Sequence, residues 1–139
     1  MTAAAFTAVF IAMLVGHHIG DRWLQTDHQA TTKDAPGLGG WLACGRHVTG
    51  YTAATAGLTT VAVVTLGLPI HPLAIIAGQL LSAGSHLVID RRYTLRWVVH
   101  TLTRWNKTYY DDIPGGAEHL DQAAHVLCLF AAALATAIL

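Results

Sequence analysis

The chain has 139 residues, of which 53% are hydrophobic and only 12% are charged, and its formal net charge at pH 7 is zero. Soluble globular domains carry about 25% charged residues, so this composition excludes an ordinary soluble domain and indicates that lipid is the solvent. The neutral charge gives no reason to expect nucleic acid as a partner. Two cysteines are too few for a disulfide framework, and we expect both to be reduced.

Four apolar stretches divide the chain, each close to the ~20 residues that a helix needs to cross the hydrocarbon core. Residues 123–139 contain no Asp, Glu, Lys or Arg, whereas a soluble helix shows a polar face. The sequence therefore predicts an all-α fold, a four-transmembrane-helix bundle in which residues 1–139 form a single integral membrane domain. The alternative is a soluble bundle with Ala-rich core helices. The predicted spans cover about residues 3–19, 47–68, 72–89 and 120–139.

The charged residues predict the orientation of these spans. All eight Lys and Arg and all eight Asp and Glu lie in two segments, residues 21–46 and 90–121. In a four-span topology these segments are the first and third connections, which share one side of the membrane. The positive-inside rule assigns that side to the cytoplasm. We therefore expect a multi-pass protein of the bacterial inner membrane with both termini outside.

The third connection is basic and apolar at once. Residues 91–107 combine four arginines with Trp97 and Trp105 at approximate helical spacing. This mixture is typical of an amphipathic helix that lies in the headgroup plane. We predict a cytoplasmic interfacial helix here, between the third and fourth spans, with membrane lipid as its partner and its arginines as anchors to anionic lipid.

Each predicted span carries one pair of polar residues four positions apart, which places both on one helical face. Because successive spans run in opposite directions, all four pairs fall at one depth near the cytoplasmic side. A helix with two metal ligands uses this spacing, and ionisable groups inside spans usually mark function. The pairs are His17 and Asp21, His47 and Tyr51, His86 and Asp90, and Asp121 and His125.

These pairs together offer four imidazoles and three carboxylates, an excess of hydrogen-bond acceptors that a divalent cation would satisfy. We predict a metal site with zinc as the first choice and manganese, iron or nickel as alternatives, and two metals bridged by a carboxylate remain open. The alternative is that the pairs only hydrogen-bond the bundle together. The predicted metal ligands are His17, Asp21, His47, His86, Asp90, Asp121 and His125, and the residues expected to contact these ligands or a substrate are Gln25, Lys33, Tyr51 and Gln122.

The same motifs give the chain a resemblance to a family of bacterial and phage polytopic membrane proteins, domain of unknown function 3307. The resemblance rests on His17-x-x-x-Asp21 followed by Gln25 and Lys33, on His47, on His86-x-x-Ile-Asp90 and on Asp121-Gln-x-x-His125. It implies the helical membrane fold and the polar cluster, and no activity. The chain is more loosely similar to inner-membrane metal-dependent hydrolases, from which it departs at Tyr51, where a second histidine is expected.

The leading functional prediction is a metal-dependent membrane hydrolase with its site near the cytoplasmic face. Its substrate would be a lipid-linked or amphipathic ester or phosphoester, and Asp21, Asp90 and Asp121 are the candidate catalytic carboxylates. A metal or proton transporter and a non-enzymatic, metal-stabilised interaction protein are the alternatives, and a haem held between two histidines is a further one. An oligomer of identical chains is also open.

Overall fold

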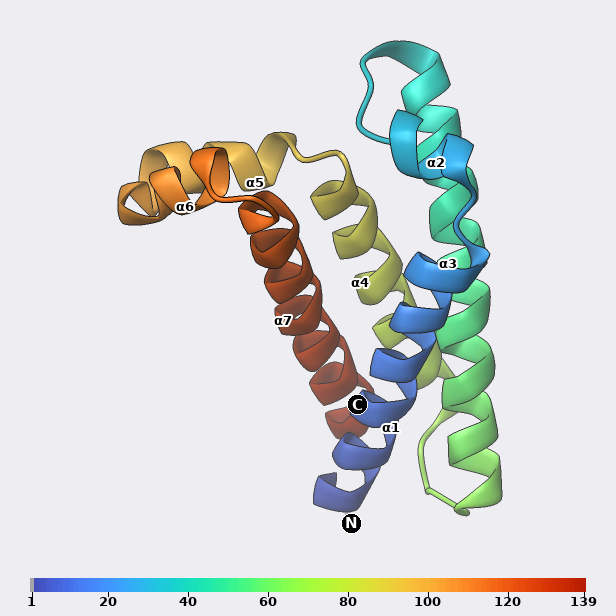
Figure 1. The fold of residues 1–139 in the computed structure, drawn as a ribbon. Helices are drawn as coiled ribbons and strands as arrows, with labels where there is room; N and C mark the ends of the chain where they lie inside the picture. Colours follow the sequence, from blue (N-terminus) through green and yellow to red (C-terminus); the bar gives the residue numbers. More distant parts are fainter. Residues whose placement is uncertain (1) are drawn as a thin grey trace.

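A computed structural model describes residues 2–139 and confirms the all-helical fold, because 86% of the chain is helical and the described residues contain no strand. Four long helices make up the bundle: α1 (Thr2–Ile19), α3 (Gly37–Thr65), α4 (Pro72–Asp90) and α7 (Gly116–Ile138). They form a ring in which α1 contacts α3, α3 contacts α4, α4 contacts α7 and α7 contacts α1. Both ends of the chain lie at the same end of this bundle (Figure 1).

Three helices are long and apolar enough to cross a membrane: Ala3–Leu24, Pro72–Asp90 and Gly116–Ile138. The predicted second span, residues 47–68, is not among them. That segment belongs to α3, which begins ten residues earlier, at Gly37, and ends at Thr65. Six threonines between residues 49 and 65 lower the mean hydropathy of this helix. Crossing by α3 therefore stays a prediction.

The turn between α3 and α4 is built by local sequence. Gly67 has a φ of 59°, a left-handed conformation that glycine adopts without steric cost. Pro72 then opens α4 at its first position, where its missing N–H costs no helical hydrogen bond. The His71 Nδ1 accepts a hydrogen bond of 3.2 Å from the Leu73 backbone N–H. The chain thus reverses sharply and brings α4 back alongside α3.

Glycines set how closely the helices approach one another. A Cβ added at Gly16 would lie 2.7 Å from the Thr55 Cα, and one at Gly20 would lie 2.9 Å from the Tyr51 Cα. Both distances are too short for any side chain. The Gly16-x-x-x-Gly20 spacing therefore lets α1 and α3 pack backbone against backbone, next to the polar residues that follow on both helices.

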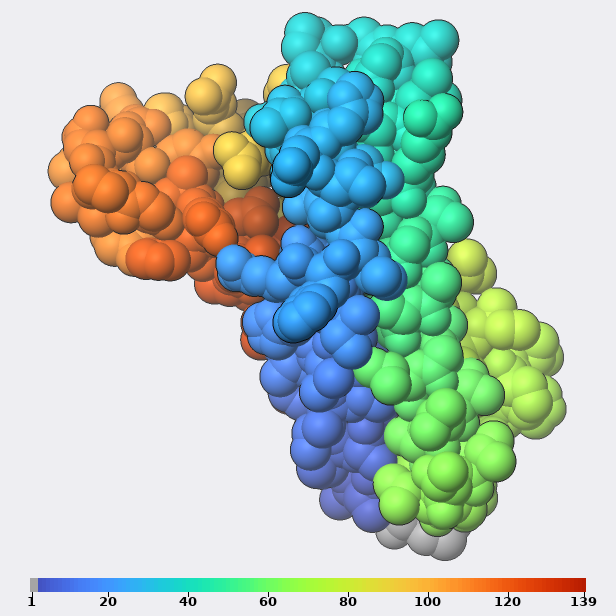
Figure 2. All heavy atoms as spheres, turned by 45° about the vertical axis from the view of Figure 1, so that its right-hand side comes forward, coloured from blue at the N-terminus to red at the C-terminus, as the bar shows by residue number. Residues whose placement is uncertain are grey.

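The connection between α4 and α7 forms an arm that projects sideways from the bundle (Figures 1 and 2). It consists of short segments: α5 (Tyr93–Trp97), the π-helical turn η2 (Val98–Leu102), the 3-10 turn η3 (Arg104–Asn106) and α6 (Lys107–Asp112). The prediction of one continuous helix over residues 91–107 is therefore wrong. Thr103, with φ −110° and ψ 51°, interrupts it. Whether the arm lies in the headgroup plane stays a prediction.

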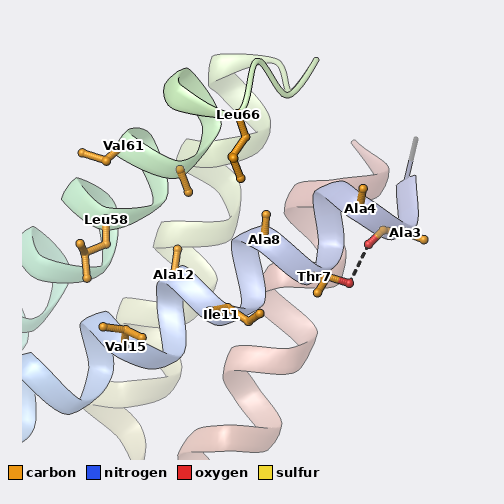
Figure 3. A pocket seen from close by; sticks show the side chains of 11 residues that line it. Ala3, Ala4, Thr7, Ala8, Ile11, Ala12, Val15, Leu58, Val61 and Leu66 are labelled. Carbon is orange, nitrogen blue, oxygen red and sulfur yellow. Dashed lines mark hydrogen bonds between the residues drawn. The ribbon is translucent and has the colours of Figure 1, made fainter.

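The end of the bundle that holds the chain termini is apolar. Val9, Met13 and Leu129 are almost completely buried there. Between α1 and α3 at this end lies a groove of about 780 Å³ lined by alanines and aliphatic side chains (Figure 3). The one hydroxyl drawn on its wall, that of Thr7, donates to the Ala3 carbonyl at 2.9 Å. The residues that line this groove include no acid, base or metal ligand, in contrast to those at the polar end of the bundle.

Candidate metal centre

The seven predicted metal ligands converge at one place inside the polar half of the bundle. The four long helices and the π-helical turn η1 (Gly20–Leu24) supply them. Six of these residues are buried, and the side chain of the seventh, Asp21, is only 6% exposed. Isolated charged groups are very costly to bury. The cost of burying these ionisable side chains must therefore be offset by opposite charges, hydrogen bonds or a bound cation at the site. Several overlapping groups of these residues have ligand atoms close enough to hold a metal ion: His17 with Asp21 and His86, His47 with His86 and Asp90, and Asp90 with Asp121 and His125.

Four atoms at the middle of the cluster lie at the spacing of ligands that share one metal ion, and we call them the tetrahedral set after the coordination that we propose for them below. His47 Nε2 and His86 Nε2 are 3.0 Å apart. Asp21 Oδ1 lies 3.2 Å from each of these nitrogens, and Asp90 Oδ2 lies 3.2 Å from His47 Nε2 and 3.3 Å from His86 Nε2. When a metal holds four ligands at about 2.0 Å, the ligand atoms lie ~3.3 Å from one another. The side chains therefore surround a point that suits a metal ion.

Hydrogen bonds among these four atoms do not account for their closeness. Asp21 Oδ1 and Asp90 Oδ2 are buried and have no hydrogen-bond partner among the described residues. A proton on His47 Nε2 can point at only one neighbour, and protons on both histidine nitrogens would face each other. A cation at the centre would instead attract all four atoms at once. The alternative prediction, that the pairs only hydrogen-bond the bundle, leaves these two carboxylate oxygens unsatisfied.

His125 extends the cluster on the side of α7. Its Nδ1 lies 2.9 Å from the Asp121 carbonyl oxygen, which only accepts, so Nδ1 carries the proton. Nε2 then presents a lone pair, and this atom is buried, has no hydrogen-bond partner in the described chain and lies 3.8 Å from Asp90 Oδ1. Such an anchored imidazole is the usual arrangement of a metal-binding histidine.

Gln122 ties the first helix to the last. His17 Nε2 lies 3.1 Å from Gln122 Oε1 and 3.6 Å from Asp21 Oδ2. The amide nitrogen of Gln122 donates to the same Asp21 oxygen at 3.4 Å. Asp21 therefore directs one oxygen toward the tetrahedral set and the other toward His17, the orientation that a carboxylate bridging two metals would need.

Lys33 supplies a fixed positive charge beside the cluster. Its Nζ donates to Asp90 Oδ1 at 2.7 Å, and both side chains are largely buried. Asp90 thus resembles Asp21 in using its two oxygens differently, one for the tetrahedral set and one for an outer partner. We predicted from the sequence that Lys33 contacts a metal ligand or a substrate, and the structure places it against Asp90, one of the predicted ligands.

Tyr51 does not contact the carboxylates through its hydroxyl. That hydroxyl lies 2.5 Å from the Ser82 Oγ. The Tyr51 ring instead stacks on the His86 imidazole, with ring centroids 3.8 Å apart and an interplanar angle of 25°. His86 Nδ1 has no hydrogen-bond partner among the described residues, so this stacking and the contacts of Nε2 hold the His86 ring.

Two features of the site were missed in the sequence. Asp21 lies in η1, a π-helical turn, and such turns are frequent at functional sites. Arg91, expected as a lipid anchor, is only 4% exposed. Its guanidinium donates to the carbonyls of Lys33 at 2.5 Å and Ala35 at 2.8 Å and lies over the Trp41 ring. Arg91 thereby holds the segment that carries Lys33 against the end of α4.

A polar cavity of about 200 Å³ reaches the cluster from the charged end of the bundle. Asp21, Asp121 and Gln122 from the cluster lie on its wall, together with Gln25, whose amide nitrogen is buried and has no partner among the described residues. The remaining wall contains Arg22, Lys33, Arg92 and Glu118, so the cavity has three basic and three acidic side chains. The polar cluster therefore borders a cavity that could admit a small polar molecule from this side.

Neither cysteine belongs to the ligand set. Cys44 lies on α3 ahead of the apolar stretch, and its thiol is 3.9 Å from the Leu87 carbonyl oxygen. Burial raises the pKa of the Cys44 thiol to about 11, which keeps it neutral. Both cysteines are free thiols. A neutral thiol is a poor metal ligand, so the site depends on nitrogen and oxygen ligands.

The chain is thus an all-helical protein with membrane-compatible helices and buried His and Asp groups that could hold a metal ion. No family model, no curated protein and no solved structure matches it.

Proposed function

We propose that this protein is a membrane-embedded, metal-dependent hydrolase that acts on an anionic amphipathic ester or phosphoester. The observation that carries the proposal is the tetrahedral set of His47, His86, Asp21 and Asp90 beside a polar cavity. A closed structural metal site needs no cavity, whereas a catalytic site needs room for water and substrate. We also propose, from the His and Asp motifs of the four long helices, that the chain belongs to the domain of unknown function 3307 family.

The proposed metal ligands are these two histidines and two aspartates, with zinc as the metal because it suits mixed nitrogen and oxygen ligands in a tetrahedral set. When bound, the ion would polarise the scissile bond and lower the pKa of a nearby water. His17 and His125 lie at the margins of the set. They would bind a second ion or hold the bridging carboxylates in place.

Asp121 is the proposed general base. It lines the cavity and sits on α7 one turn before His125, whose Nδ1 is 3.4 Å from Asp121 Oδ2. Asp21 and Asp90 are already directed at the tetrahedral set, so Asp121 is the carboxylate best placed to take a proton from water in the cavity. Lys33 and Arg92 would neutralise the anionic part of the substrate.

The proposed setting is a four-span arrangement in which α3 also crosses the bilayer. Its packing between α1 and α4 supports this, because a helix with two spanning neighbours lies in the same layer. The charged end, the cavity and the arm would then face the bacterial cytoplasm, with both termini outside. Reporter fusions after residue 139 and in the turn at residues 66–71 test the orientation, and a cytoplasmic signal from either would overturn it.

The hydrolase proposal is tested on the purified full chain in detergent micelles with zinc, using bis(p-nitrophenyl) phosphate and p-nitrophenyl esters of long-chain acids as probes. We expect release of p-nitrophenol that EDTA abolishes. Asp121→Asn should lower the rate at least ~100-fold, as expected for loss of a general base. Asp27→Asn, at an exposed position outside the site, should leave it unchanged. Metal binding without turnover of either probe class would favour the non-enzymatic, metal-stabilised alternative.

Transport is the second candidate, and a buried polar ladder favours it. Beyond His86, the Thr55 hydroxyl donates to Gln79 Oε1 at 2.9 Å, and the Gln79 amide donates to Thr59 at 3.4 Å. The ladder ends among apolar core residues such as Val63. A proton or metal path would have to continue through that core, so hydrolysis fits better. Proton or metal flux into proteoliposomes that is lost in Gln79→Leu would favour transport over hydrolysis.

A further inference from the structure

A second basic cavity lies at the junction of the arm and the bundle. It has a volume of about 310 Å³ and is lined by three arginines, two tyrosines, two aspartates and one alanine: Arg91, Arg92, Arg96, Tyr93, Tyr110, Asp34, Asp111 and Ala117. Arg92 also lines the polar cavity beside the metal centre. Arg92 therefore contributes to both cavities. We call this second hollow the arginine cavity.

The arginine cavity is a fixed structure at its inner wall. Arg91 is held by the carbonyls of Lys33 and Ala35 and by the Trp41 ring. Its Nε is buried and has no hydrogen-bond partner among the described residues. A buried, charged N–H without an acceptor is costly, and an oxygen of a bound anion could satisfy it.

The charges in the cavity are only partly balanced by protein acids. Asp34 lies 3.8 Å from the Arg92 guanidinium, and Asp111 lies 3.2 Å from His100 Nε2. Arg96 has no acidic partner within ion-pair distance among residues 2–139. The cavity thus has three arginines and two acids, and one of these acids, Asp111, is paired with a histidine. This leaves an excess of positive charge, and the guanidinium of Arg96 is not used in an ion pair.

Arginine forks match the oxygen geometry of phosphate, which offers three strong acceptor oxygens and up to two negative charges. The surrounding arm exposes large apolar side chains, with Trp97 56% and Leu102 56% exposed, as expected for a surface that meets lipid. We propose that the arginine cavity binds a phosphate group. The phosphate would come from a lipid headgroup or from free inorganic phosphate. The suggestion that the cavity holds the phosphate of a substrate rests on the proposed hydrolase function. Phosphate binding by the cavity does not depend on that function.

Binding is measured on the full chain in nanodiscs of phosphatidylcholine, with phosphatidate as the lipid probe and inorganic phosphate as the soluble probe. Both probes are used in the presence of EDTA and again with zinc, so that hydrolysis at the metal centre cannot imitate or conceal binding. We expect saturable binding in EDTA, and Arg96→Gln should weaken it about tenfold. If phosphatidate binding saturates and inorganic phosphate does not compete with it, the site binds a lipid. Competition by inorganic phosphate assigns it to the free anion.

Two matched controls separate a built site from general surface charge. Arg104→Gln removes the same charge from an exposed position on the arm outside the cavity, and it should change binding less than twofold. Asp111→Asn removes an acid from the cavity and should strengthen binding severalfold, whereas Asp112→Asn, its neighbour outside the cavity, should not. Partial unfolding of Asp111→Asn could not strengthen phosphate binding, so such a gain would reflect the charge of the cavity. Equal losses in Arg96→Gln and Arg104→Gln, or no gain in Asp111→Asn, would overturn the proposal whatever the metal centre does.

Discussion

The Nε2 atoms of His47 on α3 and His86 on α4 lie 3.0 Å apart in the buried middle of the bundle. Each is also 3.2 Å from the same oxygen of Asp21. One proton shared between the two nitrogens accounts for their own contact, but it leaves the buried Asp21 oxygen without a hydrogen-bond donor among the described residues. A metal ion between them would give both nitrogens a common partner.

Metal binding should therefore stabilise the folded protein. A ligand that binds only the folded state adds about 4 kcal/mol of stability at a free concentration 1,000 times its dissociation constant. We expect zinc to raise the thermal unfolding midpoint of the detergent-solubilised chain and EDTA to reverse the rise. Because metal must displace protons from its ligands, the rise should shrink as the pH is lowered.

His86→Ala and His18→Ala form a matched pair for the same measurement. His86 is 1% exposed, inside the cluster, whereas His18 is exposed and adjacent to the buried His17. We expect His86→Ala to lose bound metal in elemental analysis and to unfold at the same temperature with or without zinc. His18→Ala should behave as the unmodified protein. Equal metal content in both variants would contradict the tetrahedral set.

The ion pair of Lys33 and Asp90 gives a second prediction. Removing one partner of a buried pair leaves an uncompensated charge, which typically costs about 3–5 kcal/mol. Lys33→Met should therefore destabilise the metal-free protein by about 3 kcal/mol. A metal beside Asp90 would compensate part of the lost charge, so the loss should be smaller when zinc is bound.

Thermal or chemical unfolding of Lys33→Met with and without zinc measures this difference, and Lys107→Met, at an exposed lysine on α6, is the control. A loss of the same size in both metal states would mean that the metal does not act on Asp90.

The sequence predicted the composition of the cluster because each pair of ligands follows from local helical geometry. His86 and Asp90 share a face since they are one turn apart, and alternating helix direction brings the pairs to one depth. Arg91 could not be assigned in the same way. Its acceptors are the backbone carbonyls of Lys33 and Ala35, which have no side-chain signature and lie more than fifty residues away in the chain. Sequence pattern alone cannot distinguish such an arginine from a lipid anchor.

The broken arm has a similar explanation. The basic and apolar residues from 91 to 107 do have helical spacing, and short helical segments form there. Arg92, however, takes a φ of 57°, which ends α4 and turns the chain sideways. A positive φ at a residue other than glycine depends on surrounding contacts. Local spacing carries no information about those contacts.

Close packing of α1 against α3 gives a third prediction. In Gly16→Ala the new Cβ would lie 2.7 Å from the backbone of Thr55, so α1 must move away from α3. Overpacking of this kind costs about 1–3 kcal/mol. The shift would also displace His17 and Asp21, and metal affinity should fall with stability.

Gly45→Ala is the matched control, because a Cβ at Gly45 meets nothing within 4 Å. In the interior of α3, alanine should stabilise the helix by about 0.5–1 kcal/mol. Opposite signs for the two glycine substitutions, measured by thermal unfolding, check the geometry of the α1 and α3 contact. A neutral Gly16→Ala would show that the helices are farther apart than described.

The Cys44 thiol gives the last prediction, on pH dependence. Burial raises its pKa to about 11, and the thiolate is the reactive form. In Cys128→Ser, where Cys44 is the remaining thiol, labelling by a maleimide at pH 7.5 should therefore be far slower than for a free cysteine. Its rate should rise about tenfold for each pH unit up to roughly 11, because each unit increases the thiolate fraction tenfold. Well below pH 11 the Cys44 thiol of the folded protein stays neutral. Rapid labelling of native protein at pH 7.5 would mean that Cys44 is accessible and ionised, and that α3 and α4 do not close around it.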